Sequence, residues 1–590
     1  MFSKNHDPEI KNLINNKSNK IKRHIMKLMN DKWNDQCAFL ADSKPSEKVY
    51  WRIIKQIDSG NTTSNPTILP NTPLPKDKAA ILADFYENVF KNDFFDRNFE
   101  NIFDPGEQFD EISINETIEA IKSSKSTNST GMDNISLKVL KNLPICVIEH
   151  MTKLFNYSLF FQHVPKCWKI AKIKVLKKKD IDLDNPSSYR PISLLVTTSR
   201  ILERIMNQRI TKWADSINLI HPCQSGFRKN HSCQDNIFKI IETCKIGLQN
   251  GQKCGKTDFD VEKAFDKAPH RGILMTLKSF KCPNYIGNWL VSFFSDRKFV
   301  VEIEGIFSDE KNILAGVPQG SPLSPLLFSL FINEIGKILE RHDIYFALFA
   351  DDLTIWKIHK DLFTIQAILQ SAIDDINIFF SQKGLKLNES KCIYTVFTSR
   401  LKDRLNLSIN NVSIDYCQNP KTLGIFFDPK LKFNYHFIEL RKQLTSKINL
   451  LRILSNKSNR LNISHILTIY KSLILSKLQY SMLPFLVTTN KIKKEIQSIQ
   501  NKCLKIIMNV STQTSSKYVH NTLKCEKLDK RLSILTCNFL IKAKINNPTI
   551  KIVFELHEKN NARVTRSKRS ILQRINAITL TPQLSTTQYI

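Results

Sequence analysis

Two adjacent carboxylates, Asp351 and Asp352, stand inside the otherwise apolar stretch IYFALFADDLTIWKI (344–358). The flanking apolar residues are typical of two short buried strands joined by a tight turn. Such turns favour Asn-Gly or Asp-Gly, and neighbouring carboxylates repel each other, so the pair breaks a local rule. A divalent cation would relieve the repulsion, and hard oxygen ligands select Mg²⁺ or Mn²⁺. The alternative is a pair of solvated turn carboxylates.

A second acidic segment, KTDFDVEKAFDKAPH (256–270), offers a third ligand. Asp258 and Asp260 alternate with apolar residues, as at the end of a strand, and a helix-like stretch follows. One of these carboxylates, with the adjacent pair, would make a two-metal site that activates a hydroxyl and binds nucleotide phosphates. Nucleases use the same chemistry as polymerases, so the carboxylates alone leave both classes open.

Between the two acidic segments lies AGVPQGSPLSPLLFSLFINEI (315–335). Its Gly and Pro residues predict a turn-rich loop, and its apolar run predicts a helix from about residue 324. A loop of small residues lets the backbone approach a ligand closely. An ordinary loop-to-helix junction is the plainer interpretation of the same pattern.

The elements that must position these residues occupy a long central region of alternating strand-like and helix-like patterns, from about 112 to 430. The segments around it are mostly helical or linker-like. They are a basic helical start (1–58), a Ser/Asn/Pro-rich linker (59–75), a helical stretch (about 76–91), a Lys/Leu/Ile-rich helical region (from 435) and a basic run (563–570). The basic run is interpreted either as a mobile end or as a nucleic-acid contact.

The charge balance points to a polyanionic partner. Lys and Arg number 87 against 55 Asp and Glu, a formal charge of +32. Such an excess favours nucleic acid, although a ribosomal or chromatin protein, or Lys-rich composition alone, would also show it. The 13 cysteines contain no C-x-x-C pair, which argues against a zinc ribbon. Without a signal peptide or an 18-residue apolar run, we expect reduced thiols, no membrane partner, and an intracellular location in nucleus and cytoplasm.

Taken in order, these motifs resemble the reverse transcriptases of non-LTR retrotransposons, in particular the jockey-type elements. Upstream, SYRPISLLVTTSRILERI (188–205) and QSGFRKNHSCQDNI (224–237) resemble the first two fingers motifs of that family. Downstream, GLKLNESKC (384–392) and KTLGIFFDPKLKFNYH (421–436) resemble its last palm motif and the hairpin that grips the primer. The resemblance covers roughly residues 112–530.

The resemblance implies an α+β fold of the right-hand polymerase type. This fold has fingers, a palm with a small antiparallel sheet, a helical thumb and, here, a helical N-terminal extension. The expected boundaries are an extension and linker without endonuclease (1–111), fingers and palm (112–430), a helical thumb (431–545) and a basic tail (546–590).

The resemblance also assigns the carboxylates. The first metal-binding aspartate of the family lies five residues before an aromatic residue, which places it at Asp260. Asp351 and Asp352 complete the catalytic, metal-binding set for two Mg²⁺ or Mn²⁺ ions. Asp258 then becomes a neighbour of the site, and Asp266 is expected to be structural.

Nucleotide-binding roles follow from the same motifs. Phe265 would lie beneath the incoming sugar and exclude a 2′-hydroxyl, because a rigid ring cannot retreat. Gln319 and Gly320 resemble the loop that faces the template and the nascent base pair. Arg190 resembles the arginine that forks onto the triphosphate, and Lys391 the lysine near the leaving phosphate.

Arg228 and Gly424 are assigned to the template or primer, with a structural arginine that pairs with an acid as the alternative for Arg228. The implied activity is extension of a DNA 3′-hydroxyl on an RNA template, with RNA, a DNA primer or target and dNTPs as partners. The first 110 residues contain no recognisable nuclease constellation, so we expect an endonuclease in trans. The competing interpretations are another reverse transcriptase class, such as an intron maturase or a telomerase, and a degenerate or domesticated RNA-binding relic.

Overall fold

The computed structural model describes residues 8–58, 68–96, 98–105, 109–178, 182–398, 400, 402–456, 461–559 and 569–579, without the side chains of 8–14 and 576–579. The chain divides into two compact units. We call them the helical unit (Met1–Asn65, Ile425–Leu540 and Gln573–Ile590) and the sheet unit (Pro66–Gly424 and Ile541–Leu572). Helices and sheets are thus both present, as an α+β fold requires.

The main sheet of the sheet unit has five strands in the order β12-β9-β3-β8-β7. These are β3 (Lys253–Phe259), β7 (Tyr345–Phe349), β8 (Asp352–His359), β9 (Ile393–Phe397) and β12 (Asp415–Tyr416). All neighbours pair antiparallel except β12, which pairs parallel with β9. The expected antiparallel sheet is therefore confirmed for its four long strands, and the short fifth strand departs from it.

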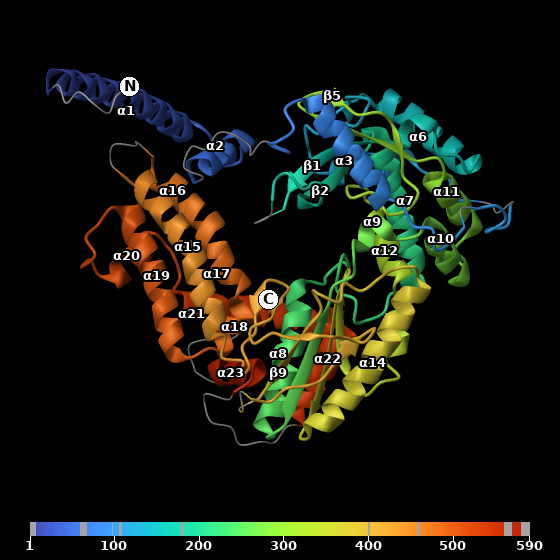
Figure 1. Ribbon diagram of the computed structural model, residues 1–590. Coiled ribbons are helices and arrows are strands. Elements are labelled where there is room, and N and C mark those ends of the chain that lie inside the picture. The colour runs from blue at the N-terminus through green and yellow to red at the C-terminus, as the bar shows by residue number, and fades with distance from the viewer. Residues whose placement is uncertain are drawn as a thin grey trace. The chain divides into compact units, whose positions relative to one another are not determined.

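Two helices cover opposite faces of this sheet, α8 (Cys233–Gln249) and α14 (Leu362–Gln382), as Figure 1 shows. Cys254 of β3 faces α8, since its sulfur lies 3.1 Å from that of Cys244. The next residue, Gly255, faces α14, because a Cβ there would lie 2.6 Å from Ile365. Successive strand residues point to opposite faces, so β3 is buried on both sides, which explains its almost unbroken burial.

The end of the chain also contributes to this layer. Helix α22 (Pro548–Glu558) packs on α8, with the rings of Phe238 and Phe554 6.1 Å apart. We expected residues 546–590 to be a basic tail, but their first part is a helix that buries Ile550 and Val553. Part of the predicted basic run, residues 563–568, and residues 59–67 of the predicted linker lie outside the described residues.

A second sheet in the same unit is built around β1, which pairs antiparallel with β2 and parallel with β4. Helix α3 packs against β4, and Phe90, just beyond the helix, meets Phe299 edge to face at 5.3 Å. The strands and helix are β1 (Ile170–Lys177), β2 (Tyr189–Leu194), β4 (Lys298–Ile303), β5 (Ile306–Phe307), β6 (Lys311–Asn312) and α3 (Pro75–Val89). The helical stretch predicted near 76–91 is thus confirmed.

The remaining helices of the sheet unit enclose one large apolar core with the main sheet. The predicted helix near residue 324 is among them. They are α4 (Ile114–Ser123), α5 (Leu137–Leu140), α6 (Ile145–Phe160), α7 (Thr197–Ser216), α9 (Ala264–Lys267), α10 (His270–Ser279), α11 (Asn284–Phe294), α12 (Ser324–Phe331) and α13 (Ile335–Leu339).

The helical unit contains the predicted helices of both ends of the chain. They are α1 (Pro8–Asp42), α2 (Lys48–Asp58), α15 (Asn434–Leu454), α16 (Ile463–Tyr470), the π-helical η4 (Lys471–Leu475), α17 (Ser476–Tyr480), α18 (Met482–Val487), α19 (Asn490–Met508), α20 (Ser516–Thr522), α21 (Leu528–Asn546) and α23 (Ile571–Thr579), the last two crossing a unit boundary. Helix α19 buries Ile496, Leu504 and Ile507 on one stripe and carries its lysines outside that stripe, so it is basic and amphipathic.

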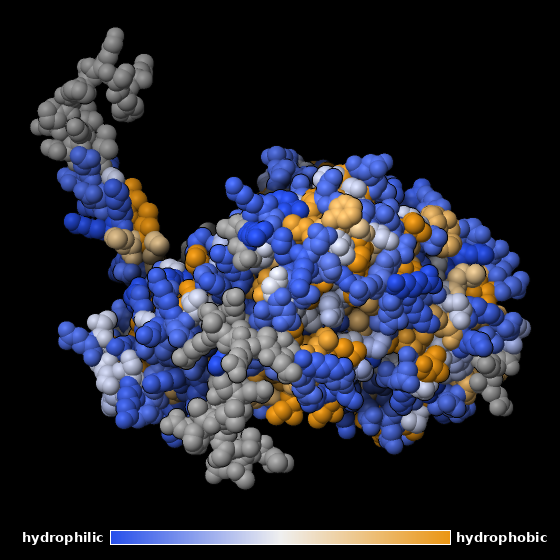
Figure 2. All heavy atoms as spheres, turned by 90° about the horizontal axis from the view of Figure 1, so that it is seen from below, coloured by the Kyte–Doolittle hydropathy of each residue, from blue (hydrophilic) through white to orange (hydrophobic). Residues whose placement is uncertain are grey.

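The face of the molecule in Figure 2 is mostly hydrophilic, with separate apolar patches. Over the described part of the chain, no helix is both long enough and apolar enough to cross a bilayer.

Candidate active site

The hairpin of β7 and β8 presents the adjacent carboxylates. The last paired residues are Phe349 and Asp352, so the two turn residues are Ala350 and Asp351. The expectation that Asp351 and Asp352 together form the turn is therefore wrong by one residue, since Asp352 already belongs to β8. Ala350 has a φ of 58°, in the left-handed region that usually requires Gly or Asn.

The third carboxylate reaches the hairpin through strand pairing. Strand β3 runs antiparallel to β8, and its last pair joins Phe259 to Leu353. One step further along this register, Asp260 comes next to Asp352. Residues opposite each other in an antiparallel ladder lie about 5 Å apart between Cβ atoms. The fold thus brings the three expected aspartates to one end of the main sheet.

The three carboxylates influence one another electrostatically. Burial raises the pKa of Asp351, the charge of Asp260 raises it further, and Arg190 opposes both. Asp352 reaches solvent on one side, yet the protein around it removes enough water to raise its pKa to about 6, and Asp351, Asp258 and Asp260 add to the shift. Negative charge therefore accumulates at this end of the sheet.

The chemistry of this donor set suits hard divalent cations, because oxygen ligands with unrelieved negative charge bind Mg²⁺ and Mn²⁺. The side chains of Asp260, Asp351 and Asp352 are neighbours, but they are not arranged around a common point as the ligands of one ion would be. Within the described residues, no group of three His, Cys, Asp or Glu side chains is gathered as closely as a bound ion requires. The carboxylate of Asp260 instead lies 3.4 Å from the ammonium of Lys391, whose side chain is largely exposed, while that of Asp260 is partly exposed.

Asp258 is occupied by other partners. Its carboxylate accepts hydrogen bonds from Thr354 at 2.7 Å, from Thr422 at 3.1 Å and from the fully buried ammonium of Lys256. Lys256 also donates to Thr422 at 2.8 Å. These bonds leave Asp258 less available to an ion than Asp260. The i, i+2 spacing of Lys256 and Asp258 in a strand is the sequence signal for this pairing, which we had not predicted.

Phe265 and the loop 316–320 lie side by side. The ring of Phe265 stacks on Phe328 with centroids 4.6 Å apart, and its carbonyl accepts from the amide of Val317 at 2.8 Å. Gly320 has a φ of 140°, and a Cβ there would lie 2.3 Å from the carbonyl oxygen of Ser193. A glycine is therefore needed for the loop to meet β2 so closely.

Gln319 is held at both its backbone and its side chain. Its carbonyl accepts from the amide of Ser193 at 2.9 Å, and its side-chain amide donates to the carboxylate of Asp266 at 2.7 Å. Burial raises the pKa of Asp266 to about 6, although the bond from Gln319 and the charges of Lys263, Lys178 and Arg190 lower it. The expected structural role of Asp266 thus includes holding a predicted nucleotide-binding side chain.

Asp266→Asn should stabilise the free protein at high pH. The asparagine oxygen can still accept from Gln319, but no charge is buried. A folded-state pKa raised from 3.8 to about 6 penalises the ionised wild type by up to about 3 kcal/mol above pH 6, and by nothing below pH 3.8. Denaturant unfolding at pH 8 and at pH 5 should therefore show a larger gain at pH 8. A gain that is equal at both pH values would contradict the assignment.

The two predicted arginines, Arg190 and Arg228, differ in burial and in their contacts. Arg190 is exposed on β2 and close enough that its charge lowers the pKa of both Asp351 and Asp266. Arg228 is half-buried and donates to the carbonyls of His221 at 3.2 Å and Gln224 at 3.4 Å, and burial lowers its pKa while the charge of Asp215 opposes that shift.

Arg228 also lines a cavity of about 290 Å³ with the exposed ring of Phe227, and Gly424 follows β13 (Lys421–Thr422) with a φ of 82°. The assignment of both residues to template or primer stays a prediction.

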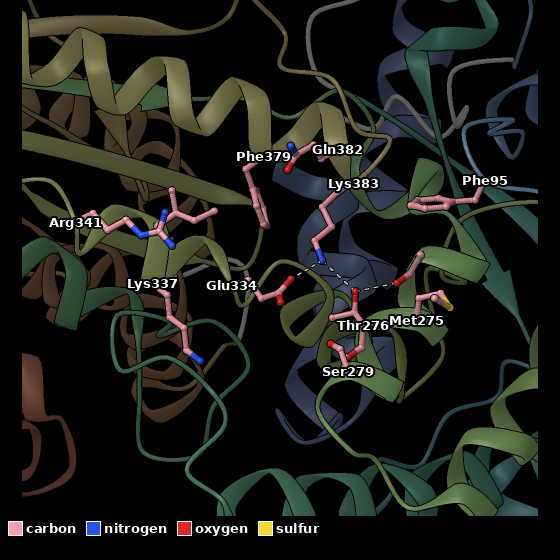
Figure 3. A pocket seen from close by; sticks show the side chains of 12 residues that line it. Phe95, Met275, Thr276, Ser279, Glu334, Lys337, Arg341, Phe379, Gln382 and Lys383 are labelled. Atoms are coloured by element: carbon pink, nitrogen blue, oxygen red, sulfur yellow. Dashed lines mark hydrogen bonds and ion pairs between the residues drawn. The ribbon is translucent and has the colours of Figure 1, made fainter. Parts of the chain in front are cut away.

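A larger cavity, of about 500 Å³, lies apart from the carboxylates and has none of them in its lining. Figure 3 shows Lys383 reaching between Glu334 and Thr276, to which it donates at 2.7 and 3.1 Å. Lys337 and Arg341 lie on the other side of Glu334. This cavity therefore offers a partly neutralised basic surface, not a second carboxylate centre.

Residues 176–427 match the family model of reverse transcriptase (RNA-dependent DNA polymerase). The chain is 26% identical over 423 residues to the RNA-directed DNA polymerase from mobile element jockey of Drosophila melanogaster, covering 70% of this chain and 46% of that protein. It is 28% identical over 415 residues to the probable RNA-directed DNA polymerase from transposon X-element of the same species, covering 69% and 45%. The chain thus spans less than half the length of these curated relatives. Among solved structures, apo telomerase from Candida tropicalis matches with a TM-score of 0.33 and 11% identity over 66% of this chain and 68% of that one, which is too weak for an argument.

Proposed function

We propose that this chain, whose residues 176–427 match the reverse transcriptase family, is an RNA-directed DNA polymerase of the non-LTR retrotransposon type. The observation that carries the proposal is the meeting of Asp260 with the Asp351–Asp352 hairpin inside the matched span. Three carboxylates at the end of a small sheet, beside an aromatic residue and a glycine-containing loop, suit nucleotide addition better than hydrolysis.

In this proposal the parts of a right-hand polymerase correspond to the units as follows. The palm is the five-stranded sheet with α8 and α14, and the fingers are the sheet around β1 with the neighbouring helices that follow residue 111. The thumb is the helical region from α15 to α21, whose basic helix α19 suits the backbone of a duplex. Residues 1–111 precede the fingers as an extension, and residues after 546 complete the palm through α22.

The reaction joins the 3′-oxygen of a DNA primer to the α-phosphorus of a dNTP, and pyrophosphate leaves. Two Mg²⁺ or Mn²⁺ ions held by Asp260, Asp351 and Asp352 would supply the charge that promotes this displacement. Arg190, exposed on β2, forks onto the triphosphate, and Lys391 neutralises charge near the leaving phosphate.

The sugar and base of the incoming nucleotide meet the other predicted residues. Phe265 lies under the sugar with its ring braced by Phe328, and Gln319 and Gly320 face the template base pair. The ion pair with Lys256 offsets part of the charge of Asp258, so Asp258 adds less negative charge to the sheet end than an unpaired carboxylate would.

The partners in this proposal are an RNA template, a DNA primer or genomic target, and dNTPs. At a genomic target the primer hydroxyl would come from a nick made by an endonuclease. Copying an RNA into genomic DNA places the protein in both cytoplasm and nucleus.

Primer extension tests the proposal directly. The purified full chain, given an annealed RNA template and labelled DNA primer with dNTPs and Mg²⁺, should lengthen the primer according to the template sequence. A parallel reaction with EDTA should show no extension. Binding of the same RNA–DNA duplex without any extension, in either Mg²⁺ or Mn²⁺, would favour the RNA-binding relic over the enzyme.

A further inference from the structure

We infer that Gln224 is a positioning residue that clamps the turn carrying Asp351 and so fixes the catalytic carboxylates. The effect on catalysis depends on the proposed function, whereas the hydrogen bonds between Gln224 and the turn do not. Gln224 lies in the string QSGFR, where only the arginine had been given a role.

The side chain of Gln224 is 2% exposed and points at the turn. Its amide oxygen accepts from the backbone amide of Ala350 at 3.0 Å and from that of Gly226 at 2.8 Å. Its amide nitrogen donates to the carbonyl of Ala350 at 3.4 Å. One side chain therefore meets both backbone polar groups of Ala350, the residue next to Asp351.

Ala350 needs such support because of its conformation. A φ of 58° is one that L residues other than Asn and Asp rarely adopt, and it persists only where the surroundings over-determine it. The two-residue loop leaves little other freedom, so fixing Ala350 also fixes the direction in which Asp351 leaves the hairpin.

The clamp is itself anchored to the edge of the main sheet. The amide of Ser225 donates to the carbonyl of Leu348 at 2.9 Å, and the amide of Leu348 donates to the carbonyl of Cys223 at 3.1 Å. Asn236 of α8 also donates to the carbonyl of Leu348 at 2.9 Å, and its oxygen accepts from the hydroxyl of Ser225 at 2.9 Å. Residues 223–225 thus lie along β7 as a short parallel addition to the sheet.

Gly226 allows this close approach. A Cβ at Gly226 would lie 2.3 Å from the amide nitrogen of Ala350, so any larger residue would push the turn away. Arg228 closes the segment from behind by donating to the carbonyl of Gln224. Gln224 consequently cannot shift without breaking the hydrogen bonds of its side-chain amide to the turn and the bond that its backbone carbonyl accepts from Arg228.

A neutral amide also suits the charges nearby. The charge of Asp351 already raises the pKa of Asp352, that of Asp260 raises the pKa of both, and an ionised side chain at position 224 would add negative charge beside them. Glutamine offers an acceptor for two amides and a donor for one carbonyl without that charge. An uncharged side chain that satisfies three backbone groups at the turn is therefore better explained by a positioning role than by simple filling of the core.

Two readouts test the inference, with Gln224→Met as the main variant because methionine keeps the volume and loses the hydrogen bonds. Hydrogen exchange of the peptide around residues 348–353 should become at least about tenfold faster, since the amide of Ala350 loses its acceptor. In primer extension, kcat should fall by about 10- to 100-fold, the effect expected when reacting groups move by about 1 Å. The KM for dTTP and the affinity for the RNA–DNA duplex should stay within about twofold.

The matched control is Gln500→Met, which removes a buried glutamine of α19 that donates to the carbonyl of Glu526 at 3.0 Å. It should lower Tm without changing exchange at residues 348–353. If Gln224→Met does not fold, Gln224→Asn replaces it, because its amide is one methylene too short to reach Ala350. Unchanged exchange at the turn, or a loss of kcat no greater than in Gln500→Met, would overturn the inference. Failure of the wild type to extend any primer would instead overturn the proposed function, and the exchange readout would still decide the clamp.

Discussion

Asp351→Asn is expected to slow primer extension by about a thousandfold or more. The substitution keeps the shape of the turn but removes one full charge from the set that would hold both cations. Cation stabilisation of the developing phosphate charge is worth several kcal/mol, and about 4 kcal/mol corresponds to a thousandfold in rate. Asp260→Asn should have a similar effect, because strand pairing brings it to the same end of the sheet.

Binding of the RNA–DNA duplex should barely change in these variants. Phosphate contacts are spread over many of the 87 Lys and Arg residues, whereas ion binding depends on a few carboxylates. Single-turnover extension and a filter-binding measurement on the same preparations separate the two effects. Asp374→Asn, a change on α14 at a carboxylate that accepts a hydrogen bond from Gln370, is the control and should extend normally. Near wild-type extension by either active-site variant would show that the carboxylates are wrongly assigned.

Phe265→Val is expected to admit ribonucleotides. The wild-type ring is half-buried and stacked on Phe328, so it cannot move aside for a 2′-hydroxyl. Removing it should reduce discrimination between dTTP and UTP by a factor of roughly ten to several hundred, the range open to a steric pocket. The ratio of kcat/KM for the two nucleotides measures the change.

Two further variants show whether the effect belongs to the ring. Phe328→Leu removes only the brace, so its discrimination should fall less but in the same direction. Phe160→Val alters an exposed phenylalanine on α6 and should leave discrimination unchanged. If Phe265→Val selects deoxynucleotides as strictly as the wild type, the selective contact lies elsewhere.

Local patterns were sufficient to predict the main elements of the site. The apolar runs on both sides of Asp351–Asp352 predicted the hairpin, and the Gly and Pro residues before residue 324 predicted the loop that precedes α12. The turn was misplaced by one residue, because alternation defines two strands but not the pair that closes them. The pairing of Phe349 with Asp352 places Ala350 in the turn. Its positive φ is visible only in the structure.

Other features depend on residues far apart in sequence, which no local pattern contains. Asp258 accepts a hydrogen bond from Thr422, and Ala350 is held by Gln224. The packing of α22 on α8 joins segments more than 300 residues apart, and an amphipathic helix near the end of the chain does not indicate its partner.

The return of the chain to α8 has a consequence for biosynthesis. The buried carboxylate of Glu242 accepts from the amide of Ile571 at 2.9 Å and lies 3.4 Å from His557, so its partners are translated more than 300 residues after it. The ribosome must first produce residues 425–540, which takes on the order of 10 s at typical rates. Throughout that interval Asp260, Asp351 and Asp352 have been made, while α8 lacks its cover. The nascent sheet unit therefore waits in an unfinished, aggregation-prone form, and a chain cut before Pro548 would contain Asp260, Asp351 and Asp352 but not α22, which covers α8.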